Sequence, residues 1–126
     1  MSKFVLDASA VLALMFSENG KEQVEAILDD SVISRINVTE ILTKLVENGS
    51  SIENAVRDIA EIELTIREFN EAQSISIADL RMKTKHLVLS LGDRACLALA
   101  IEENATAVTA DKSWAKLSVC PVEVIR

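Results

Sequence analysis

The sequence lacks most features that mark secreted, membrane-spanning or disordered proteins. Its 126 residues include three Gly, one Pro and two Cys, so it holds no linker, low-complexity tract or disulfide framework. No apolar run approaches the 18 or so residues of a transmembrane helix, and no signal-peptide pattern opens the chain. We therefore expect one domain over 1–126, with no membrane partner, in a reducing cytoplasm.

Aromatic and basic residues are scarce as well. There is no Tyr, and 49% of residues are hydrophobic against 3% aromatic, which predicts a core of aliphatic side chains. Lys and Arg number 13 against 20 Asp and Glu, for a net charge of −7. At face value this argues against a nucleic-acid partner, because phosphates are bound by basic patches. The single His excludes a ribonuclease that works with paired histidines.

What the sequence does contain is an alternation of short apolar strands and helical patterns. We expect strands at 4–6, 32–34, 64–66, 107–109 and 122–125. We expect helices at 8–16, 21–28, 36–47, 69–82 and 92–103, one opening at Ser51 and a short one at Trp114. This alternation predicts an α/β fold with a parallel sheet covered on both faces. Ligands in such folds bind beyond the carboxyl ends of the strands.

Four acidic residues interrupt or follow apolar sequence where that edge is expected. Asp7 follows the first strand, Asp111 follows the fourth, Asp93 begins a helix and Glu40 lies early on another. Converging carboxylates repel one another and need a cation, and hard oxygen ligands favour Mg²⁺ or Mn²⁺ over zinc. Three polar neighbours could orient these carboxylates: Ser9, Asn37 and Thr109.

Each of these residues also has a purely structural interpretation. Asp7, Asp93 and Asp111 all precede expected helices, where Asp is a common N-cap. Glu40 and Lys44 have the favourable spacing of a surface ion pair on a helix. Ser9 and Asn37 could begin or cap helices, and Thr109 could be an ordinary strand residue. These readings do not explain why three of the acids gather at one edge of one sheet.

Four segments, in this order, resemble the PIN-domain ribonucleases, in particular the VapC-type toxins of prokaryotic toxin–antitoxin modules. They are VLDASA at 5–10, NVTE at 37–40, LSLGDRACLALA at 89–100 and TADKSW at 109–114. The resemblance covers the whole chain, and 89–100 is its most specific part. It implies a three-layer α/β/α sandwich around about five parallel strands, and a Mg²⁺- or Mn²⁺-dependent endoribonuclease.

The resemblance also assigns roles to individual residues. The family's acidic quartet falls on Asp7, Glu40, Asp93 and Asp111, with Asp7 and Asp93 expected to ligate the principal metal. Its auxiliary polar positions fall on Ser9, Asn37 and Thr109. Some relatives carry a further acid shortly after the fourth; here 112–116 has none, so the match does not extend to a complete second metal position.

Substrate and partners follow from the same resemblance, which implies an RNA substrate, a cognate antitoxin protein and a homodimer. Residues that could contact RNA are basic and lie near Asp93 and Asp111: Arg81, Lys83, Lys85, Arg94 and Lys112. The helices expected at 21–28 and 51–61 each carry a stripe of apolar side chains. These stripes could contact a protein partner or could simply face the core. A solvated helix face is an equally good explanation of the basic residues.

Two other functions remain open at this point. A receiver-like or haloacid-dehalogenase-like phosphotransfer domain also places Asp and Mg²⁺ at strand ends, but needs a later lysine or an Asp-x-Asp pair. Asp7 is followed by Ala8-Ser9, and the strand at 107–109 has no lysine. The other is a PIN-like module that binds without cutting, which the retention of all four acids disfavours.

Overall fold

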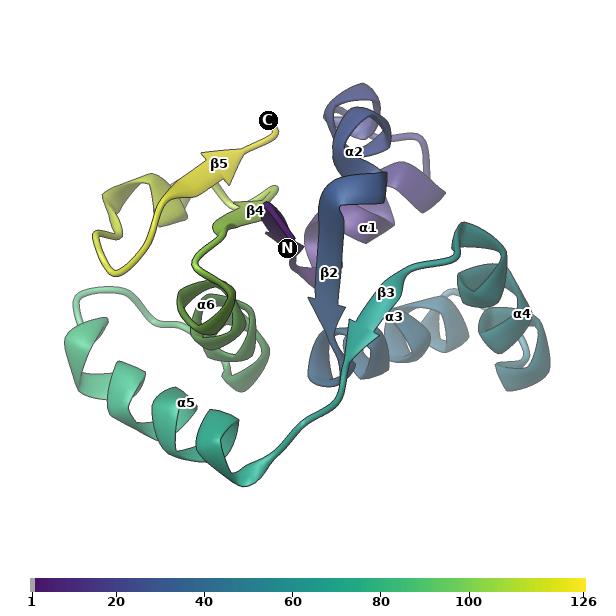
Figure 1. Ribbon diagram of the computed structural model, residues 1–126. Coiled ribbons are helices and arrows are strands. Elements are labelled where there is room, and N and C mark those ends of the chain that lie inside the picture. The colour runs from purple at the N-terminus through teal and green to yellow at the C-terminus, as the bar shows by residue number, and fades with distance from the viewer. Residues whose placement is uncertain (1) are drawn as a thin grey trace.

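A computed structural model describes residues 2–126 and confirms the parallel sheet. Its strands are β1 (Phe4–Leu6), β2 (Ser31–Ser34), β3 (Thr65–Arg67), β4 (Thr106–Thr109) and β5 (Val122–Val124). The order is β3-β2-β1-β4-β5, and every neighbouring pair is parallel. β1 therefore lies at the centre, with β2 on one side and β4 on the other (Figure 1).

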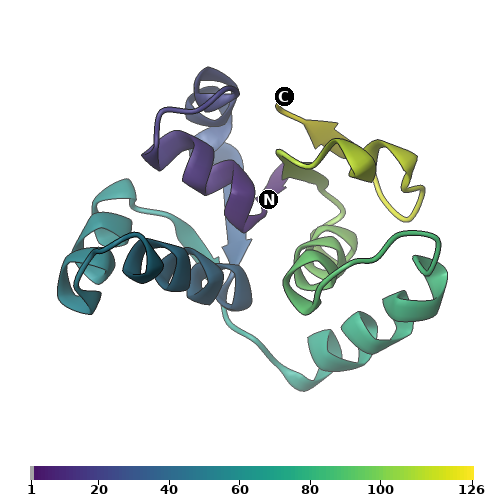
Figure 2. The ribbon, with the colours of Figure 1, turned by 180° about the vertical axis from the view of Figure 1, so that it is seen from behind.

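Helices cover both faces of the sheet, as the α/β/α interpretation requires (Figures 1 and 2). The α-helices are α1 (Ala8–Met15), α2 (Lys21–Ile27), α3 (Arg35–Glu47), α4 (Ile52–Ile62), α5 (Glu71–Lys83) and α6 (Leu91–Glu103). Two 3-10 helices are η1 (Leu28–Asp30) and η2 (Lys112–Lys116). Helices α5 and α6 lie on one face and α1 to α4 on the other. None of the helices in the described part of the chain is long and apolar enough to cross a membrane.

The alternation of side chains along the central strands creates two hydrophobic cores. Val5 of β1 and Ala107 of β4 pack with α5, α6 and Trp114. Leu6 and Val108, the next residues, pack on the opposite face with α1 to α4. Because β1 is buried on both faces, its short run Phe4–Leu6 is apolar throughout, as expected for a central parallel strand.

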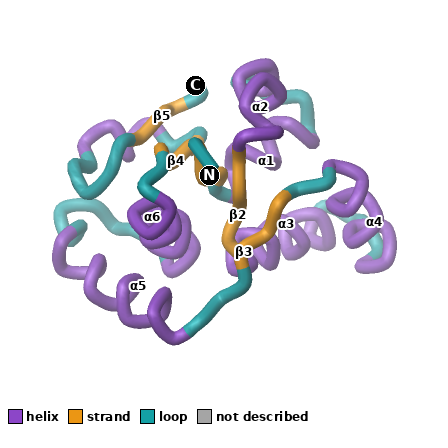
Figure 3. The backbone as a smooth tube through the Cα atoms, in the orientation of Figure 1, coloured by secondary structure: helices purple, strands orange, loops and turns teal. Residues whose placement is uncertain are grey.

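Side-chain caps explain where most helices begin. Ser34, Ser51 and Ser90 each accept a hydrogen bond from a backbone N–H in the first turn of α3, α4 and α6. Asn70 does the same for α5, which is why that helix begins at Glu71 and not at Phe69 as predicted. The third strand lies one residue later than predicted, and the last ends at Val124. Figure 3 shows how strands and helices alternate along the chain.

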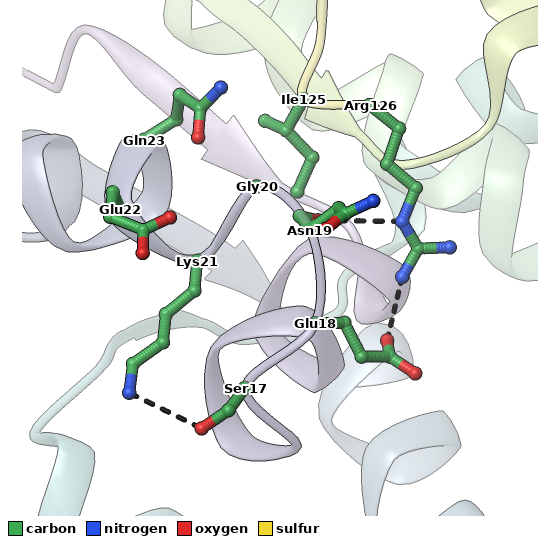
Figure 4. Close-up of a pocket in the computed structure, with 9 residues that line it drawn as sticks. All are labelled: Ser17, Glu18, Asn19, Gly20, Lys21, Glu22, Gln23, Ile125 and Arg126. Atoms are coloured by element: carbon green, nitrogen blue, oxygen red, sulfur yellow. Dashed lines mark hydrogen bonds and ion pairs between the residues drawn. The ribbon is translucent and has the colours of Figure 1, made fainter.

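The C-terminal end packs against the connection between α1 and α2 (Figure 4). Arg126 donates from Nη2 to Glu18 Oε1 at 2.7 Å, and Ile125 lies over Gly20. Gly20 has φ +100°, and a Cβ there would stand 2.7 Å from the backbone oxygen of Ile125. A cavity of about 570 Å³ adjoins this contact, lined by residues 17–23, 125 and 126. Only glycine meets both the conformation and the close approach at this position.

We predict that Gly20→Ala destabilises the protein more than Gly49→Ala. Gly49 has a matching φ of +101° but no atom within 4 Å of an added Cβ. Both variants should lose about 1–2 kcal/mol because Ala disfavours positive φ. Gly20→Ala should lose a further 1–3 kcal/mol or so from overlap with Ile125. Urea unfolding measures the difference, and equal losses would show that the Ile125 contact is unimportant.

Candidate active site

The Asp7 carboxylate is buried at the carboxyl end of β1, with 5% of the residue exposed. Its Oδ1 accepts hydrogen bonds from Ser9 Oγ at 2.7 Å and from the Ala10 backbone N–H at 2.8 Å. Its Oδ2 accepts from Thr109 Oγ1 at 2.6 Å. Every Asp7 oxygen thus has a fixed donor, and the carboxylate has one orientation at the start of α1.

Ser9 and Thr109 connect this carboxylate to β4. Thr109 is the last residue of β4, and its Oγ1 also accepts from the Asp111 backbone N–H at 3.1 Å. Ser9 Oγ accepts from the Ala110 backbone N–H at 2.9 Å. The two hydroxyls lie 3.3 Å apart. They therefore hold the ends of β1 and β4 together around Asp7, as the auxiliary interpretation of both residues predicts.

Glu40 reaches the same edge from the second turn of α3. Its Oε1 accepts from Asn37 Nδ2 at 2.8 Å, and the same amide donates to the Gly92 carbonyl of α6 at 3.0 Å. Gly92 makes room for this carboxylate, since a Cβ there would overlap Glu40. Asn37 is buried, and its Oδ1 has no donor among residues 2–126.

Asp93 faces the same space from the first turn of α6. It forms a capping box with Ser90: Asp93 Oδ2 accepts from the Ser90 N–H at 2.9 Å, and Ser90 Oγ accepts from the Asp93 N–H at 3.1 Å. A cleft of about 270 Å³ is lined by the three carboxylates together with Ala8, Ser9, Leu12 and Lys44. The structure thus brings Asp7, Glu40 and Asp93 together from three separate elements.

Electrostatic coupling between these acids follows from their placement. Burial raises the pKa of Asp7 from 3.8 to about 6, and the Asp93 charge adds to the rise against three lowering hydrogen bonds. Burial also raises the pKa of Glu40, again with a contribution from Asp93, while the Asn37 hydrogen bond lowers it. Negative charge in the cleft is therefore costly without a compensating cation.

Asp111 occupies a different position. It is exposed at the N-terminus of η2, and its Oδ1 accepts from the backbone N–H and hydroxyl of Ser113 at 2.9 and 2.7 Å. Its side chain does not line the cleft, although its backbone bonds to Thr109. The capping interpretation is thus correct for Asp111 and also for Asp7, while Asp93 stands at the third helical position.

The family comparison identifies the domain. A family model described as PIN domain matches residues 4–119. The chain belongs to the PIN domain family. No curated protein sequence matches it significantly.

Solved structures share the fold at low sequence identity. DNA-bound VapBC from Salmonella typhimurium aligns with a TM-score of 0.78 at 16% identity, covering 100% of both chains. A toxin–antitoxin complex from Klebsiella pneumoniae gives 0.77 at 20% identity, with 98% of each chain covered. VapC20 of Mycobacterium tuberculosis, a sarcin–ricin-loop-cleaving toxin, gives 0.73 at 13% identity, covering 94% of this chain and 99% of that one.

The donor atoms of the side chains lining the cleft are of the type that a hard divalent cation prefers. These side chains supply carboxylate oxygens from the end of β1, from α3 and from α6. Within residues 2–126, no group of three or more His, Cys, Asp or Glu side chains forms a ready metal-holding arrangement. Asp93 and Glu40 instead bond to their own neighbours, Ser90 and Asn37. The capping box uses only Oδ2 of Asp93, so its Oδ1 accepts no hydrogen bond from residues 2–126.

The basic residues lie differently from the sequence-based expectation. The cation lining the cleft is Lys44, which we expected only to pair with Glu40. No ion pair joins Lys44 and Glu40 in the described chain. Its position one turn after Glu40 was the signal that could have placed it. None of the five expected RNA contacts lines the cleft: Arg81, Lys83, Lys85 and Lys112 are exposed, and Arg94 is half-buried.

We predict that Asp7→Asn stabilises the metal-free protein at pH 8. A folded-state pKa of about 6 lies above the ordinary 3.8, so the folded state binds this proton more tightly than the unfolded chain. The group therefore favours folding below pH 4, and that contribution is lost as the pH rises to about 6. Asn keeps the cap and removes the charge, for a gain of about 2 kcal/mol.

Urea unfolding at pH 5 and pH 8 in chelator measures this effect. The parent should lose stability over this range relative to Asp7→Asn. The matched control is Asp58→Asn, which removes an exposed carboxylate on α4. It should leave the free energy of unfolding unchanged at both pH values. An Asp7→Asn protein less stable than the parent at pH 8 would contradict the burial cost.

Proposed function

We propose that this PIN domain is a divalent-metal-dependent endoribonuclease that hydrolyses RNA phosphodiester bonds. The observation that carries the proposal is the convergence of Asp7, Glu40 and Asp93 on one cleft at the carboxyl edge of the sheet. Its fold is shared with toxins, one of them a sarcin–ricin-loop-cleaving protein. Mg²⁺ is the cation we expect, with Mn²⁺ able to replace it.

Asp7, Glu40 and Asp93 would hold the cation, and Asp111 would join them once its carboxylate turns from Ser113 toward the cleft. When bound, such a cation lowers the pKa of a water molecule and offsets negative charge on the phosphoryl oxygens. Ser9 and Thr109 keep the Asp7 carboxylate in one orientation, while Asn37 fixes Glu40 against α6. Lys44, at the rim of the cleft, supplies a positive charge for a backbone phosphate.

The acidic composition fits this proposal better than it first suggests. Four of the twenty acids belong to the proposed centre, and a bound cation offsets part of their charge where phosphate must approach. RNA should therefore bind weakly without metal. The exposed acidic cleft also suits a basic protein partner.

We propose a cognate antitoxin as that partner, in a complex of which this chain is the toxin. Support comes from the Klebsiella pneumoniae toxin–antitoxin complex and the Salmonella typhimurium VapBC, which share the fold over almost the full chain. A homodimer, RNA contacts by the five basic residues and a cytoplasmic location remain part of the same proposal.

The phosphotransfer alternative has less support. A phospho-accepting Asp needs an exposed oxygen and a lysine partner, whereas both Asp7 oxygens accept hydrogen bonds and the residue is 5% exposed. Lys44 lines the cleft but makes no hydrogen bond to Asp7 in the described chain. The three converging carboxylates also disfavour a PIN-like module without activity.

We predict that Asp7→Asn and Asp93→Asn each lower Mg²⁺-dependent RNA cleavage at least about 100-fold, because each removes a ligand charge. Initial cleavage rates of a labelled RNA, with and without chelator, measure the effect. Circular dichroism should show both variants folded. Asp58→Asn should cut as fast as the parent. Cleavage at the parent rate by either site variant would refute the site assignment.

We also predict that Gly92→Ala lowers cleavage about 10- to 100-fold, although no functional group is removed. The added methyl overlaps the Glu40 carboxylate and displaces it from the cleft. Gly49→Ala is the matched control, because its added methyl meets nothing within 4 Å. A Gly92→Ala protein with full activity would show that Glu40 need not occupy its observed position.

A further inference from the structure

A second pocket lies beside the acidic cleft, where the loop before α5 passes the starts of α3 and α6. Its volume is about 390 Å³. Its lining combines apolar side chains, a hydroxyl and one guanidinium: Ile36, Phe69, Ile77, Ala78, Leu91 and Arg94, with Ser74 at its edge. No acidic side chain lines it, in contrast to the cleft.

The pocket and the cleft share the same two helix starts. Leu91 and Arg94 line the pocket, while Asp93 between them lines the cleft. Ile36 of α3 lines the pocket, and the next residue, Asn37, bonds to Glu40 and to the Gly92 carbonyl. The two hollows therefore lie on either side of the α3–α6 contact.

Two large apolar side chains are left open to solvent at this pocket. Phe69 is 47% exposed and Leu91 is 57% exposed. Few aromatic side chains are exposed in the described chain. Trp114 is fully buried, and the other exposed Phe is Phe16, at 40%. Phe69 precedes the N-cap Asn70, so it lies in the loop before α5, and its side chain lines the pocket.

Arg94 forms a fixed polar wall. Its Nη1 donates to the Ile77 carbonyl at 3.0 Å, which holds the guanidinium against α5. Its Nε is buried and finds no acceptor anywhere in the described chain. A planar cation held in the wall of a pocket suits a flat ligand that has carbonyl or ring-nitrogen acceptors.

We propose that this pocket binds a nucleobase of the RNA whose phosphate lies in the acidic cleft. The inference rests on the proposed ribonuclease activity and names a specificity subsite for it. Unstacked bases bind proteins by stacking on aromatic rings and guanidinium planes, which Phe69 and Arg94 provide. The positive charge of Arg94, and a lining that alternates with that of the cleft at Asp93 and Arg94, favour RNA over an apolar protein segment as the occupant.

The test is an NMR titration of the metal-free protein with AMP, GMP, CMP and UMP, with ribose 5-phosphate as the base-free control. At least one nucleotide should shift the signals of Phe69, Ile77, Ala78 and Leu91, and ribose 5-phosphate should not. Phe69→Ala should lower the affinity for that nucleotide about 10-fold, as expected for loss of one stacking contact. Phe16→Ala, the other exposed Phe, should bind like the parent.

Three outcomes would overturn the proposal. In the first, nucleotides and ribose 5-phosphate shift the same signals, which would confine binding to phosphate contacts. In the second, the pocket signals change with protein concentration alone, which would assign the pocket to a second copy of the chain. In the third, no nucleotide shifts the pocket signals of the parent protein. Because the titration needs neither metal nor RNA cleavage, this result overturns the subsite alone. A parent protein that never cuts RNA overturns the proposed function separately.

Discussion

The burial of a carboxylate among other carboxylates is the constraint on which the site depends. Asp7 stands at the end of the central strand, almost without solvent, and shares its cleft with Glu40 and Asp93. Its charge is stabilised by two hydroxyls, one backbone N–H and the N-terminus of α1. These donors do not compensate fully, since the pKa of Asp7 still rises to about 6.

The fold supplies the precision that this arrangement needs. Parallel strands bring the ends of β1 and β4 to one edge, where Ser9 and Thr109 link them. Asn37 links α3 to α6 by donating to both Glu40 and Gly92, and the missing side chain of Gly92 leaves room for the carboxylate. Asp7 is thus both the N-cap of α1 and a candidate metal ligand, and the two interpretations of this residue do not compete.

Much of this could be predicted from the sequence, because it depends on local patterns. Short apolar runs predicted the five strands to within about a residue, and their parallel pairing placed Asp7 at the ligand-binding edge. Motif spacing also predicted Ser9, Thr109 and Asn37 as neighbours of the carboxylates. These contacts follow from strand ends and helix turns, which a sequence reveals.

What could not be predicted depends on side-chain direction and on contacts between distant segments. Asp111 was expected beside Asp7, but Ser113 draws its carboxylate onto its own helix. Lys44 lines the cleft, whereas Arg94 turns toward Ile77 of α5, seventeen residues earlier in the chain. The need for glycine at position 92 appears only once α3 and α6 are packed together.

The central claim is that Asp7, Glu40 and Asp93 form one cation site, and Mn²⁺ binding followed by electron paramagnetic resonance tests it most directly. The parent should bind Mn²⁺, with Mg²⁺ competing. Asp7→Asn, Glu40→Gln and Asp93→Asn should each weaken Mn²⁺ binding at least about 10-fold. Asp58→Asn should leave it unchanged. Equal Mn²⁺ affinity in the parent and all three site variants would contradict the account.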